Sequence, residues 1–350
     1  MSVEIFSAIA DQVGCSPQTV QCVLNRPLRD KRPTIVKRTE RIRGLAAEMN
    51  YRPNAAAKSL VTGRFNCVAL VLSESCDVSF LPPGMLERLA IALARRDLHL
   101  TIACLSERDL TSEPTMPRLL KESMSDGLLI DYTDNIPPAL SELVDRYRIA
   151  SIWYNAQRAH DCVCPDDFGA GREAAERLIA LGHRRIAYMD VHGAHRRERP
   201  EFHFSVPARR DGYVHAMRAA GLEPDVVETN PPGRSPASET MALWRAIFRR
   251  PARPTAVMAY ASDALVPVFA AATACRLRVP CDLSLLSFCS PCVEWGDFGL
   301  SVMAHDTEAL ADAAAQAIVA RIARPERSLK PVNVPFRYVP LEKPSVGPAP

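Results

Sequence analysis

Amide and hydroxyl side chains follow one another at helical spacing in residues 16–25, SPQTVQCVLN. Ser16 can cap a helix through its side-chain oxygen, and Pro17 suits the first helical position, where no backbone N–H is needed. The open face of this helix would carry Gln18, Thr19, Gln21 and Cys22. Side-chain amides form paired hydrogen bonds with adenine edges in the DNA major groove, so the pattern predicts a base-reading helix.

Cysteine and histidine clusters offer redox or metal chemistry as a second possibility. Cys289 and Cys292 form a C-x-x-C pair, Cys162 and Cys164 are one residue apart, and one basic stretch carries His192, His195 and His203. An isolated C-x-x-C is a weak metal signal, and cysteines in a reducing compartment often serve as small buried residues. Both interpretations stay open, and no cofactor or bound metal is expected.

Two further helices must position the helix at 16–25. Residues 4–13 carry apolar side chains at helical spacing, and Gly14 permits a tight turn after them. A longer helix is expected from about Thr34 to Asn50. The expected core residues are Val20, Val23, Leu24, Val36, Ile42, Leu45, Ala46 and Met49. This arrangement predicts an all-α helix-turn-helix headpiece over residues 1–51.

Positive charge is concentrated in the same part of the chain. Residues 1–63 contain ten Lys and Arg against five Asp and Glu, a local charge of +5, whereas all 350 residues together carry only +3. A basic module on a nearly neutral body is typical of a polyanion-binding domain, although a solvated surface would give the same balance.

A linker and a different sequence pattern follow the headpiece. Residues 52–64 contain Pro53, which ends the preceding helix, and Asn54, which can cap a short Ala-rich helix. The apolar runs beyond them are CVALVL, LHLTIACLS, SDGLLIDY, IASIWYNA, RRIAYMDV, PTAVMAY and DLSLLSF. Their alternation with helical stretches predicts an α/β body over 65–340, made of two lobes with doubly wound parallel sheets. A Pro-rich tail, 341–350, ends the chain.

Several classes of protein are disfavoured by what the sequence lacks. The start of the chain has no basic and apolar leader, and no apolar run is long enough to span a bilayer, so a cytoplasmic protein without membrane contact is expected. Walker, dinucleotide-binding, nucleophile-elbow and H-E-x-x-H motifs are missing, so an enzyme is not expected. A two-lobed binding protein without DNA-binding activity is the alternative.

The chain resembles the LacI/GalR family of transcription regulators along essentially its whole length. The resemblance rests on IADQVGCSPQTVQCVLN, NYRPNAAAKSL, DDFGAGREAAERLIALGHRRIAYM, RRDGYVHAMRAAGL and RLRVPCDLSLLSF, which occur in the family's order. It implies a homodimer with a periplasmic-binding-protein-like body, a roughly palindromic double-stranded DNA operator, and a small-molecule effector that changes operator affinity. Repression is the expected activity.

The resemblance also assigns residues to the DNA interface. They are Ser16, Pro17, Gln18, Thr19, Gln21, Cys22, Asn25, Tyr51, Asn54, Ala57, Lys58 and Leu60. Leu60 is the residue that wedges between bases in the minor groove. Where the family reads T-V-S-R-V-L-N, this chain reads TVQCVLN, so Gln21 and Cys22 replace the usual serine and the base-reading arginine. A changed operator sequence is therefore expected.

In the effector site the resemblance places Asn155, Arg209, Ser262, Asp263 and Cys289. Asn155, Ser262 and Cys289 stand where the family commonly has polar or acidic ligand-binding residues. An arginine without carboxylates beside it favours an anionic effector, such as a carboxylate or phosphate. Two alternatives stay open: Arg209 as a structural ion-pair partner, and a decayed pocket without effector response.

Overall fold

The computed structural model describes residues 2–25, 32–52, 59, 62–74, 79–106, 110, 120, 122, 124–133, 136–191, 203–229, 236–289, 294–295, 298–339 and 341–350. These residues form two compact units. The first comprises residues 1–67 with 124–126, and the second comprises 68–123 with 127–350. No helix among the described residues is long and apolar enough to cross a membrane.

The first unit contains three helices, α1 (Ser2–Val13), α2 (Pro17–Asn25) and α3 (Pro33–Glu48). Gly14, with φ of 67°, makes the turn between α1 and α2, and the Ser16 hydroxyl accepts a hydrogen bond from the Thr19 N–H at 3.2 Å. The fully buried core consists of Ile9, Ala10, Val20, Ile42 and Ala46. The caps and the apolar spacing therefore produce the expected three-helix arrangement, with α3 ending two residues before the predicted Asn50.

The first lobe of the body is a six-stranded sheet in the order β13-β5-β4-β3-β1-β2. Its strands are β1 (Cys67–Ser73), β2 (His99–Leu105), β3 (Gly127–Asp131), β4 (Ser151–Tyr154), β5 (Cys162–Pro165) and β13 (Val332–Val334). Helices α5 (Met85–Ala94) and α12 (Thr307–Ala323) bury one face, and α7 (Pro138–Arg146) packs on the other. The neighbouring strands from β1 through β3, β4 and β5 to β13 run parallel.

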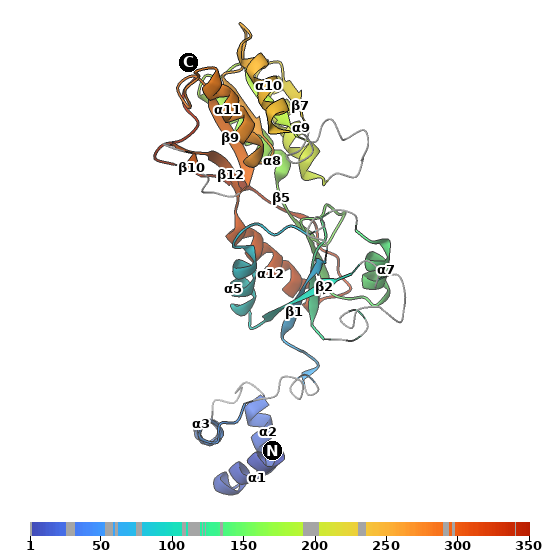
Figure 1. The fold of residues 1–350 in the computed structure, drawn as a ribbon. Helices are drawn as coiled ribbons and strands as arrows, with labels where there is room; N and C mark the ends of the chain where they lie inside the picture. The colour runs from blue at the N-terminus through green and yellow to red at the C-terminus, as the bar shows by residue number, and fades with distance from the viewer. Residues whose placement is uncertain are drawn as a thin grey trace. The chain divides into compact units, whose positions relative to one another are not determined.

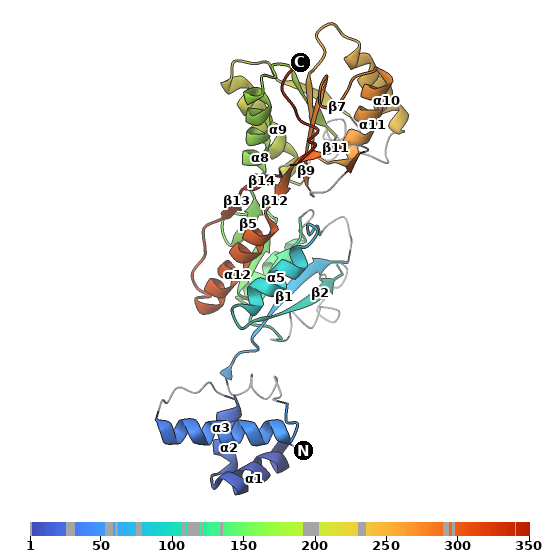
Figure 2. The ribbon, with the colours of Figure 1, turned by 90° about the vertical axis from the view of Figure 1, so that its left-hand side faces the viewer.

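The second lobe repeats this design with the order β14-β12-β9-β8-β6-β7. Its strands are β6 (Ile186–Asp190), β7 (Asp225–Glu228), β8 (Ala256–Ala259), β9 (Ser284–Cys289), β12 (Ser301–His305) and β14 (Phe336–Tyr338). Helices α8 (Asp167–Ala180) and α9 (Ser205–Ala219) cover one face, while α10 (Ala237–Phe248) and α11 (Val266–Ala274) cover the other. Figures 1 and 2 show these helices on either side of the sheet.

Smaller elements complete this lobe. The short 3-10 helix η2 (Asp263–Leu265) precedes α11, and β10 (Glu294–Trp295) pairs antiparallel with β11 (Phe298–Gly299). The edge strand β14 is antiparallel to β12, unlike the rest of the sheet. The sequence alternation thus predicted the two parallel sheets correctly, but not this reversed edge strand.

The chain passes between the lobes from β5 to α8, from β12 to α12 and from β13 to β14 (Figure 2). Each lobe therefore contains segments that are distant in sequence. The last residues, which the sequence set apart as a tail, pack on the second lobe: Ser345 is fully buried and its hydroxyl donates to the Leu285 carbonyl at 2.6 Å.

Helices α8 and α9 cross with their backbones in close contact. A side chain added at Gly171 would collide with the carbonyl of Arg209, and one added at Gly212 would collide with the carbonyl of Phe168. Glycine at both positions lets the two helices approach. This crossing fixes the position of the polar groups at the start of both helices.

Candidate functional site

Helix α2 presents most of the residues expected to read DNA at its open surface. Ser16, Pro17, Gln18 and Cys22 are exposed, and Thr19 and Gln21 are partly exposed. The Ser16 and Thr19 hydroxyls lie 2.9 Å apart, so these side chains hold the start of the helix. The exposed amide of Gln18 is free to face a partner surface, as the sequence predicted.

Two of the expected DNA contacts are placed differently. Asn25 is only 6% exposed at the end of α2, and its direct contact with DNA stays a prediction. The Tyr51 ring is partly buried and packs edge-on against Phe6 with centroids 5.2 Å apart. Both side chains therefore support the headpiece core. The minor-groove residues Asn54, Ala57, Lys58 and Leu60 lie outside the described residues.

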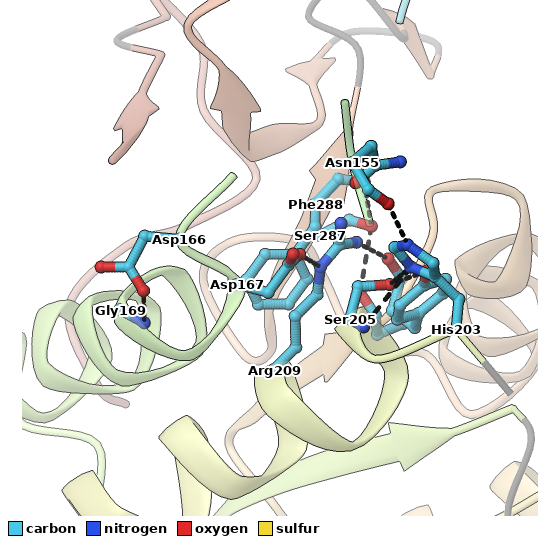
Figure 3. A network of polar contacts seen from close by, with 11 residues as sticks. Asn155, Asp166, Asp167, Gly169, His203, Ser205, Arg209, Ser287 and Phe288 are labelled. Carbon is cyan, nitrogen blue, oxygen red and sulfur yellow. Dashed lines mark hydrogen bonds and ion pairs between the residues drawn. The ribbon is translucent and has the colours of Figure 1, made fainter. Parts of the chain in front are cut away.

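A second polar site lies in the body, where α8 and α9 begin beside the sheet of the second lobe (Figure 3). Asp166 caps α8 by accepting a hydrogen bond from the Gly169 N–H at 2.9 Å. The next residue, Asp167, turns its carboxylate to Arg209, whose Nε lies 2.7 Å from Oδ1. Both side chains are less than 5% exposed. This is a buried ion pair formed by residues from two helices.

Arg209 is held by further groups of the second lobe. Its Nη1 donates to the carbonyl of Tyr260 at 3.0 Å. The guanidinium also lies 4.4 Å from the centre of the Tyr260 ring, 5.2 Å from that of Phe288 and 5.3 Å from that of Phe336. Aromatic faces attract cations, so this surrounding stabilises the charge and fixes the side chain in place.

The Arg209–Asp167 pair changes the expectation about the effector. The preference for an anionic ligand assumed an arginine without carboxylates beside it, and that premise is wrong because Asp167 neutralises Arg209. Sequence reasoning missed Asp167, although it is the second aspartate of the quoted DDFGAG segment. The ion pair thus favours the interpretation that Arg209 is a structural ion-pair partner.

A chain of polar contacts extends from this pair to the first lobe. The Tyr260 and Ser205 hydroxyls lie 2.7 Å apart, and Nδ1 of His203 lies 2.7 Å from the Ser205 hydroxyl. Nε2 of His203 lies 2.9 Å from the carbonyl oxygen of Asn155, at the end of β4. A carbonyl only accepts, so Nε2 carries the proton and donates. His203 thereby connects the second lobe to the first.

A second histidine, His305, lies at the end of β12 near this network. It is buried against the Phe336 ring, with centroids 4.5 Å apart. Burial, followed by the charges of Arg209 and His203, lowers the pKa of His305 to about 3. His305 is therefore neutral at physiological pH and adds no positive charge to the site.

The other expected effector residues lie at strand ends or in the loops that follow. Asn155 is buried with a positive φ of 54°, and its carbonyl is the acceptor for His203. Asp263 is exposed as the first residue of η2, and its carboxylate accepts a hydrogen bond from the Ala264 N–H at 3.0 Å. Among the residues that the structure describes, the buried Ser262 hydroxyl has no hydrogen-bond partner. The side chain of Cys289 lies outside the described residues.

Sequence reasoning did not identify three more buried polar groups, two of which lie at the carboxyl ends of strands. Asp131 ends β3, Tyr154 ends β4 and Tyr188 lies in β6. In the described structure neither oxygen of Asp131 has a hydrogen-bond partner, and the hydroxyls of both tyrosines have none. A polar residue that ends a strand of a parallel sheet was the available sequence signal.

The thiol pair Cys162 and Cys164 lies in β5, and both side chains belong to the core that α7 covers. Both residues are 3% exposed, and their thiols donate to the carbonyls of Arg158 and Ala156. The hydrogen bond from the Cys164 side chain lowers the pKa of Cys162 to about 6. Burial nevertheless limits access to either sulfur, which favours a structural role. Cys292, His192 and His195 lie outside the described residues, and the described ones contain no cluster of three or more metal-binding side chains.

Comparisons with known proteins relate both parts of the chain to regulators. A model for a periplasmic binding protein-like domain matches residues 175–341. The chain is 29% identical over 232 residues to the HTH-type transcriptional regulator CelR of Thermobifida fusca, covering 64% of this chain and 63%, just under two thirds, of that relative. It is 25% identical over 328 residues to the ribose operon repressor of Escherichia coli K12, covering 91% and 92%. Both relatives are named as regulators of transcription.

Solved structures share the fold. A complex of the transcriptional regulator CelR with cellobiose superposes with a TM-score of 0.58 at 22% identity, covering 97% of this chain and 99% of that one. The Lac repressor dimer bound to operator and the anti-inducer ONPF gives 0.66 at 16% identity, covering 95% and 96%. The two-lobed parallel architecture is thus common to all three proteins.

Proposed function

Since the chain belongs to the LacI/GalR family of transcription regulators, we propose that it is a homodimeric repressor whose affinity for a palindromic operator is set by a small molecule. Each headpiece would read one half of the operator, with the hinge residues Asn54, Ala57, Lys58 and Leu60 in the central minor groove. A repressor acts on the chromosome, so the proposed location is the cytoplasm.

The observation that carries this proposal is the exposed face of α2 above a buried three-helix core. Pro17, Gln18 and Cys22 are exposed, while Val20 is fully buried between the helices. A helix that buries one side and presents an amide near its N-terminus has the geometry that major-groove recognition requires. Cys22 cannot make the paired contacts that an arginine makes with guanine, so Gln18 and Gln21 are the proposed base readers.

The proposed effector site is at the strand ends between Arg209 and Asn155. The Arg209–Asp167 pair supports a hydroxyl-bearing ligand rather than an anion, because the guanidinium charge is already compensated. Among the relatives, the CelR complex holds cellobiose, and the E. coli repressor is named for the ribose operon. A small hydroxylated molecule is the corresponding proposal here.

The test is a genome-wide map of the DNA bound by the tagged full-length protein, followed by anisotropy titrations on the recovered motif. A shared palindrome and a specific affinity that falls steeply with salt are expected, because phosphate contacts release counterions. Diffuse binding without a motif would favour a decayed regulator. A protein that binds small molecules but no DNA would instead be a two-lobed binding protein.

A further inference from the structure

Three neighbouring side chains at the strand ends of the first lobe and the start of α8 are buried with unused hydrogen-bonding atoms. Asp131, Tyr154 and Asp167 are 0%, 1% and 2% exposed. Within the described structure, both carboxylate oxygens of Asp131, the Tyr154 hydroxyl and Oδ2 of Asp167 have no hydrogen-bond partner. Buried polar atoms are nearly always satisfied, so a group of adjacent exceptions indicates a missing ligand.

The three groups belong together in space. Ile130 pairs with Trp153 in the β3–β4 register, so Asp131 and Tyr154 are the next residues on adjacent parallel strands. Burial raises the pKa of Tyr154, and the charges of Asp131, Cys164 and Asp167 raise it further. The cluster therefore continues from the first lobe to the Arg209 pair.

The carboxylates of Asp167 and Asp131 differ in whether a cation is paired with them. Asp167 is neutralised by Arg209 at 2.7 Å, whereas Asp131 forms no ion pair with any described residue. Arg210 is the next cation on α9. Its Nη2 lies 2.8 Å from Oδ1 of Asp211, and its Nη1 lies 3.7 Å from Oδ2 of Asp190. The site therefore contains one carboxyl group without a compensating cation.

A buried carboxyl group without a cation stays protonated or requires a positively charged partner. Burial raises the pKa of Asp131 to about 8, so the free protein holds this group mostly neutral at pH 7. A ligand ammonium would restore the charge balance, because it supplies both a cation and several N–H donors to the two free oxygens.

We propose that the effector is a hydroxylated amine, such as an amino sugar, whose ammonium group pairs with Asp131 and whose hydroxyls contact Tyr154 and Asp167. This inference rests on the proposed function of the site. Binding at neutral pH converts the Asp131 carboxylic acid to a carboxylate beside the ligand ammonium and releases the carboxyl proton to solvent. The ligand keeps its own proton, so the charge and proton count balance.

The experiment is calorimetry and thermal denaturation of the full-length protein without DNA. The probes are glucose and galactose, their 2-amino-2-deoxy counterparts, and the corresponding uronic acids. At least one amino sugar is expected to raise Tm and to bind more than tenfold more tightly than its neutral counterpart. Titration in buffers of different ionisation enthalpy should show release of nearly one proton at pH 7.

Asp131→Asn is expected to remove both the amine preference and the proton release. Asp97→Asn is the matched control, because Asp97 is exposed and its φ of 57° suits asparagine. Equal binding of neutral sugars, unchanged amine binding by Asp131→Asn, or no shift with either amino sugar would overturn the inference. Operator binding is assayed separately: release by a neutral sugar would preserve the proposed repressor function, whereas failure to bind any operator would contradict that function alone.

Discussion

Asp167 and Arg209 form a buried ion pair, with Oδ1 of the carboxylate 2.7 Å from Nε of the guanidinium. Asp167 is the first residue of α8, and Arg209 lies in α9. Their pairing therefore depends on the close crossing of these helices at Gly171 and Gly212. Removing one partner of a buried pair leaves an uncompensated charge, which generally costs more than removing both. The pair therefore provides a direct test of the body's architecture.

Arg209→Met is expected to lower the free energy of unfolding of the body by about 3–5 kcal/mol, because Asp167 remains buried and unpaired. The double variant Arg209→Met with Asp167→Leu is expected to be more stable than the single one. Urea denaturation followed by tryptophan fluorescence measures both, since Trp244 is fully buried in the second lobe. Equal losses in the single and double variants would show that the pair contributes no coupling.

Gly212→Ala is expected to destabilise the second lobe by about 1–3 kcal/mol or more, because the new methyl group collides with the Phe168 carbonyl. Thermal denaturation measures the loss. Gly44→Ala in α3 is the control, because an added side chain meets no atom within 4 Å there and alanine favours a helix. A wild-type Tm for Gly212→Ala would contradict the tight crossing of α8 and α9.

Gln18→Ala is expected to relax operator specificity at one or two base pairs, each by about 1–3 kcal/mol, because a paired amide–base contact is lost. Binding to a library of single-base operator variants measures this change. Gln12→Ala is the matched control, since Gln12 is also exposed but lies on α1. A uniform loss of affinity for all sequences would instead assign Gln18 to the phosphate backbone.

Asp131 is expected to make stability depend on pH. Burial raises its pKa in the folded protein to about 8, well above the value of an exposed aspartate, so the folded state retains this proton longer than the unfolded state. The contribution of Asp131 to the free energy of unfolding is fully present below about pH 4 and is lost as the pH rises through about 8.

The free energy of unfolding is predicted to decline by about 1.4 kcal/mol per pH unit between roughly pH 5 and 8. Asp131→Asn should remove this slope, so its stability relative to the wild type should increase with pH. Denaturant titrations of both proteins across this range measure the difference, with Asp97→Asn as control. Parallel pH profiles for wild type and Asp131→Asn would place the Asp131 pKa near its ordinary value.

The sequence by itself determined the headpiece helices and the class of the body. Ser16, Pro17 and Gly14 act within a few residues of chain, so their effect on α2 is local and readable. The alternation of apolar strands and helices likewise predicted two parallel sheets, because burial on both faces gives continuous apolar runs. The family's spaced motifs predicted the regulator function that the comparisons support.

Only the tertiary structure decided which polar groups meet. Asp167 and Arg209 are 42 residues apart, and His203 reaches Asn155 across 48 residues, so no local spacing encodes either contact. In the sequence, Asp131 is an ordinary aspartate at the end of an expected strand. Burial in the folded protein alone raises its pKa. The charge of a site depends on the sum of its neighbours, and the fold determines which residues those are.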